Sequence, residues 1–322
     1  IVLLATGSNY FNNPGRGDYG PLTYSVPANR GVEPLSNIAI TFKIDRTTIP
    51  DKINVYEITA NSEEKNALFF QSLLTIFGAS ESGSIMKIPN STIVENSGPS
   101  YFFAGDLSNG YASFSGKNNR VFAGNYITYE KQAKKLLLPT INNLGYDASI
   151  SSALVDYHDG EPLPSVNKEL ADAITFSFQT TVDNFPVIGV GQSFDLVNLI
   201  VDKKEGSVVK MDWLLPQIDK NKFYPYDTIN INSIKKIPVD RFSLLSTSLK
   251  NGAKLPNAST SDINKLEINE IKIAYATTDT GSGYLRPIYL LSGFGILKDG
   301  REIAVTLMLP AVKNQQPLSP EP

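Results

Sequence analysis

Two stretches of this sequence have the pattern of an α-helix, and each is followed by several short runs in which apolar and polar residues alternate. In residues 62–78, Ser62 can cap the helix, acidic residues fill its first turn and a glycine follows it. In residues 128–145, Pro139 is expected to kink the helix or to end its first part. The alternating runs predict half-buried strands. This order predicts an α+β fold in which a helix covers one face of each antiparallel sheet.

A third unit of the same kind is predicted near the C-terminal end. Residues 239–252 are expected to form a short helix with Asp240 as its cap, and strand-like runs follow it. We therefore predict two to three subdomains, built from repeated units of one helix packed on antiparallel β-meanders. The predicted parts are an extended segment 1–36, a helix-plus-sheet unit 37–125, a second unit 126–226, a C-terminal unit 227–312 and a polar tail 313–322.

The chemical inventory of the chain excludes several kinds of site. The chain has no cysteine, which excludes disulfides, thiolate metal sites and cysteine nucleophiles. His158 is its one histidine, so no site here uses two imidazoles. The formal net charge of −3 gives no electrostatic reason to expect a nucleic acid or an anionic membrane surface as a partner. No cofactor and no metal is predicted.

One tetrapeptide matches a catalytic motif. Asp279-Thr280-Gly281-Ser282 has the sequence that carries the catalytic carboxylate in pepsin-like proteases. Such a site needs two aspartates that share a proton, because one acts as a base while the other acts as an acid. The chain contains no second Asp-Thr-Gly or Asp-Ser-Gly, and strand-like residues flank the motif on both sides. The motif is therefore predicted to be the tip of a β-hairpin.

A second stretch places four potential ligands close together. Asp156, His158, Asp159 and Glu161 lie in one short run, which is compatible with a hard cation or with a hydrolytic acid–base pair. However, Asp159 and the glycine after it are a strong signal for a two-residue hairpin turn, and the flanking residues are strand-like. We predict a solvated hairpin end here, with no catalytic residue assigned.

Aromatic residues are frequent, with 15 tyrosines and 16 phenylalanines, and many of them lie in strand-like runs. Packing in the core is one explanation. The other is that some of them share one exposed sheet face and form a surface that binds a partner. The residues proposed for this contact surface are Tyr101, Phe102, Phe103, Tyr224, Tyr226, Tyr284 and Tyr289.

Two segments are similar to known families. Residues 178–213, FQTTVDNFPVIGVGQSFDLVNLIVDKKEGSVVKMDW, resemble the hairpin of PepSY-type modules. Residues 284–312, YLRPIYLLSGFGILKDGREIAVTLMLPAV, resemble the closing strands of YycH/YycI-like regulatory proteins, with a Pro-x-Tyr-x-x-x-Gly strand before a final antiparallel strand. The arrangement is also similar to that of uncharacterised bacterial single-pass membrane proteins. The resemblance implies a non-enzymatic, extracytoplasmic domain that holds or regulates a partner, and it supplies no catalytic residue.

Three functions follow as expectations. The first is an extracytoplasmic interaction or regulatory module of a bacterial protein, anchored to the membrane only through an N-terminal segment absent from this sequence. The second is a structural subunit of a cell-surface assembly, with the irregular ends of the chain lying on neighbouring subunits. The third is a carbohydrate- or peptidoglycan-active enzyme that uses dispersed carboxylates. The expected partner is therefore a protein, either another protein or a second copy of this chain.

Overall fold

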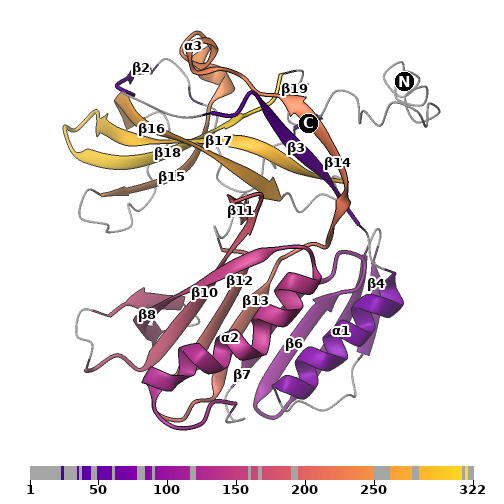
Figure 1. Ribbon diagram of the computed structural model, residues 1–322. Helices are drawn as coiled ribbons and strands as arrows, with labels where there is room; N and C mark the ends of the chain where they lie inside the picture. Colours follow the sequence, from indigo (N-terminus) through magenta and orange to yellow (C-terminus); the bar gives the residue numbers. More distant parts are fainter. Residues whose placement is uncertain are drawn as a thin grey trace. The chain divides into compact units, whose positions relative to one another are not determined.

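The chain forms two compact units. Unit 1 consists of residues 1–57, 190–192 and 221–322, and unit 2 of residues 58–189 and 193–220. The computed structural model, drawn in Figure 1, describes residues 23–24, 35, 38–44, 49–59, 62–77, 84–88, 91–116, 121–158, 161–165, 169–189, 195–249, 262–277, 283–313 and 316–317.

Unit 2 contains two long helices, and the sequence signals placed both. Ser62 caps the first helix as predicted, because its Oγ accepts a hydrogen bond from the backbone N–H of Lys65 at 3.3 Å. The second helix begins earlier than predicted, with Asn125 as its N-cap residue, and it continues through Pro139 without ending there. The bounds are α1 Glu63–Ile76 and α2 Tyr126–Asn143.

One antiparallel sheet underlies both helices of unit 2, which lie on the same face of it (Figure 1). Its strand order is β4-β5-β6-β7-β13-β12-β10-β8-β9. The halves of the sheet that follow α1 and α2 are joined where β7 pairs with β13. The bounds are β4 Ser84–Ile88, β5 Ser91–Gly98, β6 Tyr101–Asp106, β7 Tyr111–Gly116, β8 Asp147–His158, β9 Glu161–Pro164, β10 Ala173–Val182, β12 Val197–Asp202 and β13 Val208–Trp213.

A tight turn after β10 leads into β11 (Phe185–Gly189), which folds back on the end of β10. Asp183 and Asn184 form this turn with φ angles of 51° and 65°. Positive φ at both central residues is the requirement of a type I′ hairpin turn, and short polar side chains such as these tolerate it. The local sequence therefore fixes the direction in which the chain leaves β10.

Aromatic side chains fill the layer between the helices and the sheet of unit 2. Phe70 of α1 lies directly on Gly105, where a Cβ atom would come within 2.5 Å of the phenyl ring. The same ring contacts Phe103 edge-on, with centroids 5.6 Å apart. The ring centroid of Phe69 lies 5.1 Å from that of the fully buried Trp213. Gly105, near the end of β6, thus makes room for the helix to approach the sheet closely.

Unit 1 is built from a mixed sheet in the order β15-β18-β17-β16-β2, in which only the β16–β2 pair is parallel. The start of β17 also pairs with β3, which in turn pairs with β14. Near the two ends of the chain, β1 pairs with β19. The bounds are β1 Thr23–Tyr24, β2 Ala39–Phe42, β3 Lys52–Ile58, β14 Ile218–Asp227, β15 Ser243–Leu249, β16 Ile263–Thr277, β17 Tyr284–Leu297, β18 Glu302–Pro310 and β19 Gln316–Pro317.

Buried tyrosines connect the strands of unit 1. The ring of Tyr275 packs edge-on against Tyr56, with centroids 6.0 Å apart, and its hydroxyl donates to the backbone oxygen of Asn54 at 2.7 Å. The hydroxyl of Tyr289 donates to the backbone oxygen of Ile229 at 2.6 Å. Each tyrosine therefore places an apolar ring in the core and satisfies its one polar atom with a backbone carbonyl.

The predicted fold of repeated helix-on-meander units is wrong. Strands predominate in the residues that the structure describes, and the third helix found there, α3 (Ile231–Ile234), has only four residues. Where a helix was expected at 239–252, a single 3-10 turn at Val239–Arg241 is followed by β15, which pairs with β18. The two long helices, moreover, share one continuous sheet through the pairing of β7 with β13.

Candidate contact surface

The strands that flank both motifs that suggested chemistry pair as antiparallel neighbours. Asp279 and the next three residues are outside the described part of the chain, but β16 and β17 on either side pair as antiparallel strands, with Ala276 opposite Arg286. His158, at the end of β8, is opposite Glu161, at the start of β9. This register confirms the predicted hairpin between them. Within the described residues, no group of three or more Asp, Glu or His side chains is placed to hold a metal ion.

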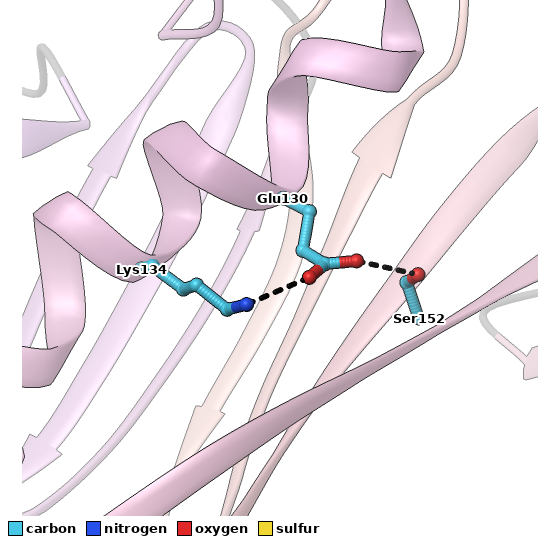
Figure 2. A network of polar contacts seen from close by, with 3 residues as sticks. All are labelled: Glu130, Lys134 and Ser152. Atoms are coloured by element: carbon cyan, nitrogen blue, oxygen red, sulfur yellow. Dashed lines mark hydrogen bonds and ion pairs between the residues drawn. The ribbon is translucent and has the colours of Figure 1, made fainter.

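A polar network on unit 2 has the residue types of a hydrolytic site, but its geometry serves a different purpose (Figure 2). Glu130 of α2 accepts a hydrogen bond from Lys134 Nζ at 2.9 Å on one carboxylate oxygen and from Ser152 Oγ at 3.2 Å on the other. The hydrogen bond from Lys134 lowers the pKa of Glu130, which makes the carboxylate a weaker base. The network fastens α2 to β8.

The aromatic residues of the predicted contact surface fall into two groups, one in each unit. In unit 2, Phe102 is exposed at 43%, whereas its neighbour Phe103 is fully buried. Tyr101 lies between these extremes, and its hydroxyl donates to Asn96 Oδ1 at 2.7 Å. Of these three residues, Phe102 is the one whose side chain is presented to solvent.

In unit 1, Tyr289 is fully buried, so it belongs to the core. Its burial raises its pKa from 10.0 to about 12. Tyr224, Tyr226 and Tyr284 are half-buried. Burial, together with the nearby charge of Glu57, also raises the pKa of Tyr284. The structure thus assigns Phe103 and Tyr289 to the interior, and the aromatic residues left for a contact surface are divided between the units.

On unit 2, a lysine joins two segments that carry exposed apolar residues. Tyr126 and Ile127, in the first turn of α2, are 41% and 72% exposed, and Leu170, in the turn before β10, is 76% exposed. Lys203 joins these two segments: its ammonium lies 5.3 Å from the centre of the Tyr126 ring and donates to the backbone oxygen of Glu169 at 3.3 Å. We call this group, with Lys204 and Glu205 of the adjoining turn, the Lys203 patch.

The turn that carries Lys203 is held in place by backbone hydrogen bonds. Asp202 Oδ1 accepts hydrogen bonds from the backbone N–H groups of Lys204 and Glu205, at 2.8 and 2.6 Å. The carbonyl oxygen of Gly206, which has φ +69°, accepts from the N–H groups of residues 121 and 122. The turn that carries Lys203, Lys204 and Glu205 is therefore fixed.

Reasoning from sequence missed this patch because its parts come from three separate turns. Ile127 and Leu170 belong to no distinctive local pattern in the sequence. The segment of Leu170 is brought to the Lys203 turn by the pairing of β10 with β12, which places the start of β10 beside the end of β12. For Ile127 and Leu170, the only signal in the sequence is that each is an apolar residue beside a predicted turn.

None of the helices that the structure describes is both long enough and apolar enough to cross a membrane. No protein-family model matches the chain, and no curated protein matches it. Among solved structures, the fold is similar to that of an uncharacterized protein from Eubacterium rectale, with a TM-score of 0.51 and 11% sequence identity over 84% of this chain and 86% of that chain. At this identity the similarity concerns the fold alone.

Proposed function

We propose that this chain is a non-enzymatic interaction module that contacts a protein partner through the Lys203 patch. The observation that carries the proposal is the exposure of Ile127 and Leu170, at 72% and 76%, on two segments that Lys203 joins. Single exposed apolar residues are common on soluble proteins. Exposed apolar residues with a polar rim are typical of interaction sites.

The expected role agrees with what the resemblance to extracytoplasmic regulatory proteins implies. A position outside the cytoplasm and a membrane anchor remain predictions, and the contact role does not depend on them. Burial of two aliphatic side chains that are now mostly in water would contribute about 1.5–3 kcal/mol each to binding. The fixed turn limits the entropy lost on association.

Site-specific photocrosslinking tests this function. A photoreactive amino acid placed at Ile127 in the full chain, in the cells that make the protein, is expected to give a discrete crosslinked protein on irradiation. The matched control carries the same group at Leu68, an exposed leucine of α1 (61%) that lies outside the patch. Equal crosslinking at both positions, or none at Ile127, would refute the contact role.

A further inference from the structure

The turn between β6 and β7 contains Asn109-Gly110, a dipeptide that is prone to deamidation. Glycine has no side chain to shield its backbone nitrogen, so this nitrogen can attack the Cγ atom of the preceding asparagine. The new N–C bond closes a succinimide ring, and the side-chain nitrogen leaves as ammonia, which carries away the proton of the glycine N–H. Water then opens the ring at either carbonyl and leaves aspartate or isoaspartate. Asn109 is exposed, so water reaches the reacting group.

In the folded chain, Asp106 restrains both reacting groups of this dipeptide. Its Oδ2 accepts a hydrogen bond from Asn109 Nδ2 at 2.6 Å, which holds the side-chain amide on the carboxylate. Its backbone oxygen accepts from the N–H of Gly110 at 2.8 Å, which occupies the attacking nitrogen. Its Oδ1 accepts from the N–H of Ser108 at 2.9 Å, which fixes the carboxylate itself. Both restraints on the dipeptide must break before the new bond can form, so the reaction requires the turn to open.

Deamidation would turn the contact with Asp106 from attractive to repulsive. The carboxylate formed at position 109 has no proton to donate, and it adds a second negative charge beside that of Asp106. The same turn holds the start of α1, because the buried Asn66 donates a hydrogen bond to the backbone oxygen of Leu107 at 2.6 Å. A weaker turn would therefore also weaken the attachment of α1.

We propose that Asn109 is a site of spontaneous deamidation that the folded turn suppresses, and that the product of the reaction loosens this turn. The proposal does not involve the Lys203 patch, so it is independent of the proposed function. Its two parts, the protection of Asn109 and the effect of the product, are tested by separate measurements on the full chain.

Peptide mapping by mass spectrometry, after incubation in mildly alkaline buffer, tests the protection. In denaturing urea, Asn109 should react at a rate similar to that of Asn251, which also precedes a glycine. In native buffer, Asn109 should react at least about tenfold more slowly than in urea, because only the open turn reacts. Asp106→Asn leaves one acceptor oxygen for two donors and should raise the native rate at least about threefold. Equal rates in buffer and urea, no reaction in urea, or an unchanged rate in Asp106→Asn would overturn the protected site.

Thermal unfolding tests the effect of the product. Asn109→Asp reproduces one product and should melt a few degrees below Asn109→Ser, which removes the donor without adding a charge. Asp106→Asn combined with Asn109→Asp exchanges donor and acceptor, so it should regain most of this loss. If Asn109→Asp melts at the same temperature as Asn109→Ser, or if the double variant melts no higher than Asn109→Asp alone, the product does not loosen the turn.

Discussion

Gly293 allows two long strands of unit 1 to approach each other closely. It lies in β17 opposite Ile268 of β16, next to an irregularity in the register between Ile268 and Glu270. A Cβ atom at Gly293 would overlap the carbonyl oxygen of Glu267 and come within 2.9 Å of the Cα atom of Ile268. These are backbone atoms, so no side-chain rotation can relieve the overlap.

We predict that Gly293→Ala lowers the free energy of unfolding by about 2–3 kcal/mol, because the two strands must separate to accommodate one methyl group. The matched control is Gly283→Ala near the start of β17, where a Cβ atom would have no neighbour within 4 Å. That variant should be neutral or slightly stabilising. Urea titration of the two variants measures the difference, and equal stabilities would contradict the close approach.

Tyr289 predicts how stability responds to alkaline pH. Burial raises its pKa from 10.0 to about 12 in the folded chain. The group therefore contributes stability that is fully present below pH 10 and is lost as the pH rises towards 12, because only the unfolded chain ionises in that range. Tyr289→Phe should cost about 1 kcal/mol at pH 7, since the oxygen of Ile229 loses its donor, and should flatten the fall in stability between pH 10 and 12. If the free energy of unfolding of the variant falls with pH as steeply as that of the wild type, groups other than Tyr289 control this pH dependence.

Neighbouring aromatic residues illustrate how far sequence reasoning reaches for single residues. Phe102 and Phe103 are adjacent in β6, and alternation along a strand requires that they face opposite sides of the sheet. The proposed contact surface included both, although only one of them could face solvent on a sheet covered on one side. Which one lies inside depends on the face that α1 covers, and that is set by packing.

At the scale of whole elements, helices were predictable where their signals are local. The cap at Ser62 and the acidic first turn of α1 are readable within a few residues, and the structure has the helix there. Residues 243–249 were assigned to a helix, yet they form β15. This segment forms its hydrogen bonds with β18, about sixty residues further along the chain. A local sequence pattern does not indicate a pairing strand so far away.

Pro139 lies within α2, four residues before its end, and its side chain is exposed. It cannot donate the helical hydrogen bond to the carbonyl oxygen of Lys135. We predict that Pro139→Ala raises the free energy of unfolding by about 1–3 kcal/mol, because it restores a donor and removes no buried contact. Lys131→Ala, an exposed change in the same helix, is the control and should have almost no effect. A loss of stability in Pro139→Ala would mean that the sheet requires a bent helix.

At the scale of the molecule, the division into two units could not be read from local patterns. Unit 2 is closed by the pairing of β7 with β13, segments that lie more than ninety residues apart. Its two ends are also tied together, because the N–H of Thr59 donates to the oxygen of Gln217 and the N–H of Ile218 donates to the oxygen of Leu144. These contacts are entirely within unit 2, and they hold both of its ends in place.

Unit 2 is nearly continuous in sequence, since only residues 190–192 of the span 58–220 belong to unit 1. We therefore predict that a fragment of residues 58–220 folds alone, because it contains both long helices, the whole nine-strand sheet and the hydrogen bonds that fix its ends. Dispersed amide signals in its NMR spectrum and a single cooperative thermal transition would show this. A fragment that ends at residue 207 lacks β13 and should give a collapsed spectrum, since the two halves of the sheet are then no longer joined. If the longer fragment is also unfolded, the stability of unit 2 depends on residues outside it.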